Sequence, residues 1–385
     1  MLNFSYHNPV QIVFGKGSIA ELAKLVPAEA KILFTYGGGS IKRNGVYQQV
    51  TRALQGRRMI EFGGIEPNPR YETCLKAVEL VRAEGVEFLL AVGGGSVVDG
   101  TKFIAAAVPY KGKDPWDMLT NWIRVPANPL PLGCVLTLPA TGSEMNGGAV
   151  ISRDAAQEKL YFVSPRTFPR FSILDPETTY SLPPRQTANG IVDAMVHTTE
   201  QYLTYPADAP LQDRQAEAIL LTLIEEGPKA LADPQNYAVR ANLMWCATQA
   251  LNGLIGCGVP QDWTTHMIGH ELTALYGIDH AQSLALVHPG TLRHQRQRKR
   301  AKLLQYAQRV WNLQDGDEDA RVDQVIDKTE QFFRGLGVGT RFADYNIPHD
   351  AIDLVATRLA KRRMRLGEHG DLGESEIREI LALRQ

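Results

Sequence analysis

Two histidine-containing segments hold the residue types best suited to binding a divalent metal ion. In the first, Asp193 and His197 are four residues apart, a spacing that puts both on one helix face with Cβ atoms about 5–6 Å apart. The second supplies His266, His270 and His280. A carboxylate with several neutral imidazoles is a ligand set for a borderline ion such as Zn²⁺ or Fe²⁺. The spacing therefore predicts a metal site.

The clustering of histidine favours this interpretation over ordinary hydrogen bonding. A single Asp-x-x-x-His pair is common by chance, and a histidine on a helix face is often only hydrogen-bonded. This chain, however, has only nine histidines, and four of them lie within residues 197–280. Spacing alone does not decide which of the four bind the ion.

His280 cannot share an ion with His266 if one continuous helix carries both. Fourteen residues separate them, which is roughly 21 Å of helix at ~1.5 Å per residue, whereas metal–ligand bonds are only about 2.0–2.2 Å long. We therefore expect the helix to break at Gly277, because glycine is favoured where a helix ends in a left-handed residue. Residues 276–279 would then form a return loop.

The first half of the chain alternates short apolar strands with helices. Strands are predicted at 11–15, 32–36, 59–62, 88–92 and 134–136, and helices at 46–54 and 71–84. This alternation predicts an α/β domain with a parallel sheet and helices on both faces. The continuous apolar character of the strands agrees, because such strands are covered on both sides.

The second half has a different pattern, which begins at a proline-rich segment near residue 183. Apolar residues recur there at three- and four-residue spacing, which predicts helices. The predicted helices are 187–203, 211–232, 236–255, 262–275, 300–313, 320–335 and 350–363. We expect an α/β domain over 1–182 and an all-helical domain over 183–385.

Two apolar strands run directly into the sequence Gly-Gly-Gly-Ser, at 37–40 and at 93–96. Glycine permits tight turns and close approach to a ligand, and the N–H groups of a following helix favour phosphate. A third polar stretch, 137–144, also follows a strand. These features predict a nucleotide site. Ordinary glycine-rich turns remain the alternative, since no G-x-G-x-x-G occurs. Likewise, Asp99 and Lys102 lie on one side of a helix and could form a plain solvated pair.

Composition narrows the possible partners. The net charge of −1 gives no basis for binding nucleic acid or an anionic membrane, and no run of eighteen apolar residues occurs. The four cysteines lack Cys-x-x-Cys spacing, and the N-terminus lacks signal-peptide features, so a cytoplasmic protein is expected. Two basic stretches, 294–302 and 361–365, are interpreted as solvated helix faces.

These motifs resemble the iron-containing (group III) alcohol dehydrogenase family over essentially the whole chain. The resemblance rests on GGGSVVDGTK at 93–102, PATGSE at 139–144, ILDP at 173–176, GIVDAMVHTTE at 190–200 and HMIGHELTALYGIDH at 266–280. Within the family, GGIEPNP at 63–69 and NGLIGCGVPQDW at 252–263 are similar to the branch of NADPH-dependent aldehyde reductases and butanol dehydrogenases.

The resemblance implies an N-terminal nucleotide-binding domain, a C-terminal helical metal-binding domain and a site in the cleft between them. It implies one divalent ion, Fe²⁺ or Zn²⁺, bound by Asp193, His197, His266 and His280. His270 would be a non-ligand near the nicotinamide and a candidate catalytic proton relay. The implied cofactor-binding residues are Gly94, Gly95 and Ser96 at the pyrophosphate, Thr137 and Thr141 at the nicotinamide half, and Lys159; Asp99 is a further candidate.

The choice of cofactor depends on the loop after the second strand. NAD-using relatives tend to carry an Asp there, and such a carboxylate would repel a 2′-phosphate. By alignment this chain has Gly38, followed by Gly39 and Ser40, so the loop offers N–H and hydroxyl donors instead. Lys42 and Arg43 stand nearby and could pair with the phosphate. We therefore predict NADP(H).

The expected activity is hydride transfer between NADP(H) and small alcohols or aldehydes, with the ion polarising the carbonyl oxygen. A homodimer is what the resemblance implies. Two alternatives remain. Dehydroquinate synthases are lyases that share this plan and use NAD with a metal, and a non-catalytic metal-binding protein could retain the fold. A lyase of that kind would need several basic residues in the cleft to bind an acidic sugar phosphate. The central motifs here are instead dominated by Gly, Ala, Met, Leu and Trp, which suits small neutral carbonyls better.

Overall fold

The computed structural model describes residues 1–121 and 124–385. The chain forms two compact units, an α/β unit of His7–Leu182 and Pro234–Thr248, and a helical unit of Met1–Tyr6, Pro183–Asp233 and Gln249–Gln385. In the predicted division and in this one alike, a boundary falls after residue 182. They differ at 1–6 and 234–248, and the division into domains 1–182 and 183–385 stays a prediction.

A six-stranded parallel sheet forms the centre of the α/β unit. Its strands are β1 (Gln11–Phe14), β2 (Ile32–Tyr36), β3 (Met59–Phe62), β4 (Phe88–Gly94), β5 (Leu132–Leu138) and β8 (Phe171–Leu174). They follow the order β1-β8-β5-β4-β2-β3, and every neighbouring pair is parallel. The predicted class, a parallel-sheet α/β domain followed by helices, is confirmed.

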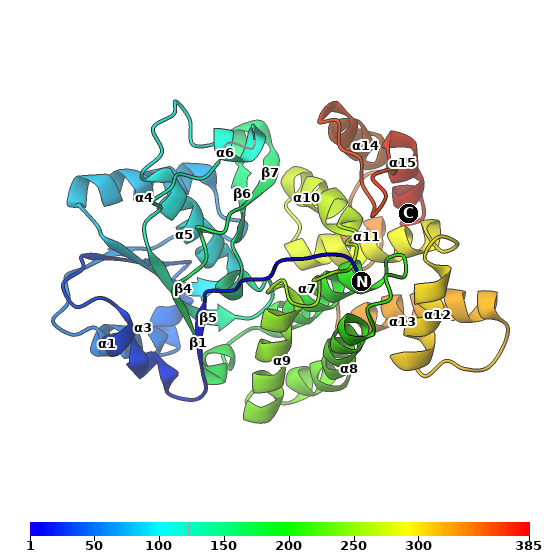
Figure 1. Cartoon of the computed structure of the whole chain (residues 1–385), viewed down its shortest axis with the longest axis horizontal. Coiled ribbons are helices and arrows are strands. Elements are labelled where there is room, and N and C mark those ends of the chain that lie inside the picture. Colours follow the sequence, from blue (N-terminus) through cyan, green and yellow to red (C-terminus); the bar gives the residue numbers. More distant parts are fainter. Residues whose placement is uncertain (122–123) are drawn as a thin grey trace. The chain divides into compact units, whose positions relative to one another are not determined.

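Helices cover both faces of this sheet. They are α1 (Leu22–Leu25), α2 (Ser40–Arg43), α3 (Val46–Ala53), α4 (Tyr71–Glu84), α5 (Gly95–Ala107) and α6 (Asp117–Thr120). In Figure 1, α4 and α5 lie on one side of the sheet and α1 and α3 on the other. Successive strand residues point to opposite faces. Accordingly, Leu33 packs with Phe103 of α5, whereas Phe34 packs with Val50 of α3.

The structure corrects three local predictions in this unit. Strand β4 extends through Gly94 and α5 begins at Gly95, so 93–96 is a direct strand-to-helix junction. Strand β5 extends to Leu138. An antiparallel hairpin of β6 (Gly148–Arg153) and β7 (Glu158–Val163) was not predicted. Its strands carry charged residues and only a weak alternation of buried positions, so the period-2 signal is faint.

The remaining helices are long and carry the second half of the chain. They are α7 (Pro184–Tyr202), α8 (Pro210–Ala232), α9 (Tyr237–Ala250), α10 (Thr264–Tyr276), α11 (His280–His294), α12 (Arg300–Arg309), α13 (Glu318–Gly335), α14 (Ala351–Lys361) and α15 (Glu374–Ala382). Helices α11 and α15 were not predicted; Pro289 and Gly290 inside α11 are helix breakers that hide its periodicity. Over the described residues, no helix combines the length and apolarity that crossing a membrane requires.

Most of α9 belongs to the α/β unit, although we predicted it for the helical domain. Met244 packs with Ala91 of β4 and Leu136 of β5. Thr248 Oγ1 donates a hydrogen bond of 2.5 Å to Oε1 of the fully buried Glu144. Since each of these partners lies more than a hundred residues before the residue of α9 that it meets, no local pattern reveals the association.

The interpretation of 294–302 as a solvated basic face is wrong for two of its lysines. Lys299 is buried, with Nζ 2.8 Å from Asp262 Oδ2 and 2.6 Å from Glu368 Oε2. Lys302 is also buried and pairs with Asp213. Carboxylates from distant segments meet these ammonium groups inside the protein, and charges are buried only when paired in this way.

Candidate metal and cofactor sites

Helix α7 positions the first two candidate metal ligands. Asp193 and His197 lie one turn apart in the middle of the helix, and both side chains are buried. His197 Nε2 is 3.6 Å from Asp193 Oδ1. Burial, with a smaller contribution from neighbouring His266, lowers the pKa of His197 well below its ordinary value. The imidazole is therefore neutral, which is the form that binds metals.

A sharp reversal between α10 and α11 brings in the other histidines. Helix α10 ends at Gly277, whose φ of 68° is left-handed, so the predicted helix break is confirmed. Asp279 then caps α11 in a capping box with Gln282. His280 is the first residue of α11 and lies near His266, with ring centroids 5.3 Å apart.

Four candidate ligand atoms lie close together in the helical unit. His266 Nε2 is 3.9 Å and His280 Nε2 3.7 Å from Asp193 Oδ1. One ligand atom each from Asp193, His197, His266 and His280 lies within 4.8 Å of every other. A tetrahedral ion with bonds of about 2.0–2.1 Å would set these atoms roughly 3.3–3.5 Å apart. Small side-chain movements would therefore let the four atoms bind one ion.

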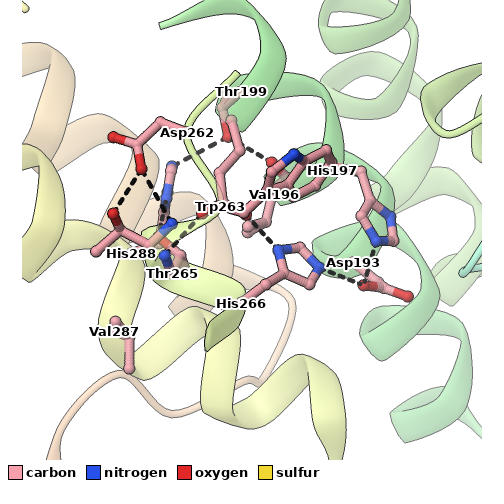
Figure 2. Close-up of polar contacts among 12 residues, drawn as sticks. Asp193, Val196, His197, Thr199, Asp262, Trp263, Thr265, His266, Val287 and His288 are labelled. Atoms are coloured by element: carbon pink, nitrogen blue, oxygen red, sulfur yellow. Dashed lines mark hydrogen bonds and ion pairs between the residues drawn. The ribbon is translucent and has the colours of Figure 1, made fainter. Parts of the chain in front are cut away.

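The environment of His266 supports the same fit. Among the described residues, its buried Nε2 atom has no hydrogen-bond partner, and Figure 2 shows this atom directed toward Asp193. A buried polar atom without a hydrogen bond is costly, and a bound ion would remove that cost. The donor set of one carboxylate and three imidazoles suits Fe²⁺ or Zn²⁺.

The structure adds Glu200, a residue that the sequence analysis did not single out. Its Oε2 atom is hydrogen-bonded to His266 Nδ1, and its Oε1 atom accepts a hydrogen bond of 2.7 Å from the backbone N–H of Thr265. Burial raises the pKa of Glu200, whereas His266 and the Thr265 N–H favour its charged form. Glu200 lies three residues beyond His197 on α7, but that spacing does not indicate its contact with His266.

His288 of α11 connects the helices that carry three of the candidate ligands. Its Nε2 atom lies 3.1 Å from Thr199 Oγ1 of α7, and its Nδ1 atom lies 3.2 Å from Thr265 Oγ1 of α10 (Figure 2). Burial lowers the pKa of His288 to about 3, so its ring is neutral. The two threonines directly precede Glu200 and His266.

His270 lies beside the four-residue cluster without belonging to it. Its ring centroid is 5.4 Å from that of His280 and 6.3 Å from that of His266. The next residue, Glu271, is buried and accepts hydrogen bonds from Arg358, at 2.6 Å, and Arg362. These contacts fix α10 against α14 and so restrict where His270 can lie.

The second Gly-Gly-Gly-Ser segment lies in a crowded part of the α/β unit. A Cβ atom added to Gly95 would lie 2.2 Å from Thr141 Oγ1, so only glycine fits there. Ser96 Oγ accepts a hydrogen bond of 3.2 Å from the N–H of Asn68, and Lys159 Nζ donates a hydrogen bond of 2.8 Å to Asn68 Oδ1. The structure thus brings the predicted cofactor residues Gly95 and Thr141 together, and it joins Ser96 and Lys159 through Asn68, a residue that the sequence analysis did not single out.

Two further predicted cofactor residues lie on neighbouring strands of this unit. Gly94 ends β4, and Thr137 is the residue before the end of β5. A Cβ atom on Gly94 would be 3.0 Å from Leu138 Cβ. The parallel strands therefore place both residues at one edge of the sheet, where ligands bind in such folds.

Asp99 and Lys102 are buried, so the solvated-pair alternative is wrong. Asp99 Oδ1 accepts a hydrogen bond of 2.5 Å from Ser143 Oγ, and Oδ2 accepts one of 2.9 Å from the N–H of Val150. Lys102 Nζ donates 2.8 Å to Ser143 Oγ and 2.8 Å to the Gly148 carbonyl. Burial lowers the pKa of Lys102 to about 8. These bonds join α5 to β6, and cofactor contact by Asp99 stays a prediction.

The loop after β2 leaves room beside the first Gly-Gly-Gly-Ser. A Cβ atom on Gly38 would meet nothing within 4 Å, whereas Gly39 has a left-handed φ of 84°. Ser40 begins α2. Lys42 is already paired, with Nζ 3.1 Å from Glu61 Oε2. Contacts of this loop with a cofactor stay predictions.

A parallel sheet of the nucleotide-binding type and a largely buried Asp–His₃ cluster are typical of metal-dependent enzymes that use a nicotinamide cofactor. Residues 9–176 match the family described as iron-containing alcohol dehydrogenase. Residues 187–384 match the Fe-containing alcohol dehydrogenase family, C-terminal. The chain belongs to the iron-containing alcohol dehydrogenase family, as its motifs indicated.

Individual relatives agree over the full length. The chain is 58% identical over 382 residues to the NADPH-dependent aldehyde reductase YqhD of Escherichia coli, covering 99% of both chains. It is 42% identical over 387 residues to a probable NADH-dependent butanol dehydrogenase 1 of Bacillus subtilis, covering 99% of both. The E. coli YqhD crystal structure covers 100% of this chain and 99% of its own, with TM-score 0.98 and 56% identity.

Proposed function

We propose that this protein is a metal-dependent oxidoreductase that transfers hydride between NADP(H) and small aldehydes or alcohols. The observation that carries the proposal is the cluster of buried Asp193, His197 and His266 with the partly buried His280, whose candidate ligand atoms lie within 4.8 Å of one another. Family membership supports the reaction class. The 58% identical relative, named for NADPH-dependent aldehyde reduction, supports the substrate and cofactor.

Each group has a distinct part in this reaction. A bound divalent ion supplies Lewis-acid polarisation of a carbonyl oxygen, and the nicotinamide cofactor supplies or accepts the hydride. Asp193, His197, His266 and His280 would hold the ion. His270 would hold or move a proton near the reacting oxygen, because it lies beside the cluster and is not among the four candidate ligands.

NADP(H) is favoured over NAD(H) by the loop at Gly38. This position carries no carboxylate and is sterically open, so a 2′-phosphate would meet donors from Gly39 and Ser40. Lys42 is held by Glu61 and lies over the rings of two tyrosines. The loop therefore offers neutral hydrogen-bond donors to a 2′-phosphate, and a negative charge at Gly38 should oppose its binding.

Gly38→Asp is expected to weaken NADPH use far more than NADH use. The new carboxylate would face a phosphate, and like charges at about 4 Å repel by several kcal/mol at an effective dielectric near 20. Solvent exposure reduces this to on the order of 1–3 kcal/mol, or roughly tenfold to a hundredfold in the ratio of kcat/KM values. The measurement is kcat/KM for both cofactors at one salt concentration.

Gly38→Asn is the matched control, since it adds the same shape without the charge. Its NADPH/NADH ratio should stay within a few-fold of the wild-type ratio. If the Asp variant keeps the wild-type ratio as well, Gly38 is not beside the 2′ position, and the argument for NADP(H) loses its main support.

The function as a whole is tested by NADPH consumption with a panel of small aldehydes, together with metal analysis of the same sample. Turnover that follows metal content supports the proposal. A protein that releases phosphate from an acidic sugar phosphate without net NADPH consumption would be a lyase. A metal-loaded protein with neither activity would be a binding protein.

Location and assembly are further parts of the proposal. The four cysteines are buried and form no disulfide over the described residues, which supports the reducing cytoplasm. A homodimer is supported by the exposed apolar side chains of Met1, Leu2 and Phe4 near the N-terminus, because grouped apolar surface marks interfaces. Light scattering of the purified protein measures the mass directly. No partnership with nucleic acid or membrane is proposed.

A further inference from the structure

We propose that Glu200 is a positioning residue that fixes the tautomer of His266 and thereby sets the affinity of the metal site. The inference rests on the proposed function, because it needs His266 to be a ligand. It concerns a residue outside the four-residue cluster, and it follows from two hydrogen bonds that meet at one buried carboxylate.

The two carboxylate oxygens of Glu200 have different hydrogen-bond partners, and one of these partners can act only as a donor. Thr265 contributes a backbone N–H, which can only donate, and it lies 2.7 Å from Oε1. His266 Nδ1 is hydrogen-bonded to Oε2. Glu200 is buried, so water does not readily replace either partner. An ionised carboxylate accepts on both oxygens, and it therefore makes Nδ1 the protonated nitrogen of His266.

Protonation at Nδ1 leaves Nε2 as the lone-pair nitrogen. This is the atom that faces Asp193 Oδ1 at 3.9 Å and that has no hydrogen-bond partner among the described residues. A metal ion needs that lone pair. A carboxylate behind a ligating histidine also raises its basicity and holds the plane of its ring. Glu200 would thus prepare Nε2 of His266 for the ion.

The neighbouring residues keep the pair in register. Thr199 precedes Glu200 on α7, and Thr265 precedes His266 on α10. The ring of His288 lies between their hydroxyls, at 3.1 Å and 3.2 Å. The backbone N–H of Asp262 also donates 2.8 Å to the Glu200 carbonyl. These hydrogen bonds together hold α7 and α10 at a fixed spacing beside Glu200 and His266.

An amide in place of the carboxylate creates a conflict that the site cannot resolve. Gln has the same shape, but one of its terminal atoms is an NH₂ donor. If its oxygen accepts from the Thr265 N–H, its NH₂ faces His266 Nδ1. That nitrogen must then carry the lone pair, and the proton moves to Nε2, where the ion should bind. The alternative orientation sets two donors against each other at Thr265.

Glu200→Gln is therefore expected to weaken Zn²⁺ binding by about tenfold to a hundredfold, the usual effect of losing a partner behind a ligating histidine. The measurement is the Zn²⁺ dissociation constant by chelator competition on the full-length apo-protein, with circular dichroism as the check of folding. A dissociation constant within twofold of the wild-type value would overturn the proposal.

Glu217→Gln is the matched control. Glu217 is also buried in the helical unit, and it accepts hydrogen bonds from Tyr202 of α7 and from Arg309. A general effect of losing a buried carboxylate would weaken zinc binding in both variants and count against the proposal. A specific role leaves the Glu217→Gln affinity at the wild-type value.

A second measurement needs no variant. In the zinc-loaded wild-type protein labelled with ¹⁵N-histidine, nitrogen shifts should show His266, assigned through contacts with Thr265, protonated at Nδ1 and zinc-bound at Nε2. A proton on Nε2 would overturn the role of Glu200. Loss of metal in a His266→Ala variant tests the site itself, so the two failures are distinguishable: metal loss in His266→Ala with normal affinity in Glu200→Gln rejects only this inference.

Discussion

Replacing His266 by alanine is expected to remove most of the bound metal and almost all activity while leaving the fold intact. Only three candidate ligands would remain, and the side chain of Glu200 would lose its imidazole partner. Lewis-acid polarisation contributes several kcal/mol to transition-state stabilisation. Its loss corresponds to a fall in kcat/KM of at least about a thousandfold, because each 1.36 kcal/mol is tenfold.

Metal content by mass spectrometry and kcat/KM for NADPH-dependent aldehyde reduction are the two measurements. His294→Ala is the control, because His294 lies at the end of α11 and pairs with Glu379 away from the cluster. It should retain full metal and near wild-type turnover. A His266→Ala protein with full metal occupancy would disprove the assignment of this ligand.

His270→Ala is expected to separate turnover from metal binding. The residue is buried beside His280 but lies outside the four-residue cluster, so metal content should stay at the wild-type value. Loss of a positioned proton donor or acceptor typically lowers turnover by 10²- to 10⁴-fold. We expect a fall in kcat of on the order of a hundredfold and a changed pH profile.

The comparison with His266→Ala decides between two roles for His270. Metal analysis and the pH dependence of kcat are measured for both variants under the same loading conditions. If His270→Ala loses as much metal as His266→Ala, then His270 is a ligand and the histidines have been assigned wrongly. If it keeps both its metal and the wild-type pH profile, His270 has no part in proton transfer.

The central fold was predictable because its signals are local. Continuous apolar runs such as 32–36 and 88–92 predicted buried parallel strands, and they are adjacent strands of the sheet. The antiparallel hairpin of β6 and β7 was missed because its strands are partly exposed and carry charged residues. Helix α11 was missed because Pro289 and Gly290 interrupt its periodicity, although tertiary packing overrides that local preference.

The candidate metal cluster was predictable for a related reason. Helical spacing links Asp193 to His197, and the distance limit on metal bonds requires a reversal before His280, which the structure has at Gly277. The support for His266 was not predictable, since Glu200 is sixty-six residues away in sequence. Nothing in a local pattern states that two distant polar side chains meet. The same reason applies to the buried Lys299.

The placement of Pro234–Thr248 has a consequence for how the protein is made. This segment belongs to the α/β unit, yet it is synthesised after the first helices of the other unit. The buried carboxylate of Glu144 has its Thr248 partner only when that segment has left the ribosome. At roughly 5–20 residues per second, the first 182 residues wait several seconds for the last piece of their own core. A fragment that stops at Leu182 would expose the surface that Met244 covers, so part of the apolar core stays in contact with solvent during this interval.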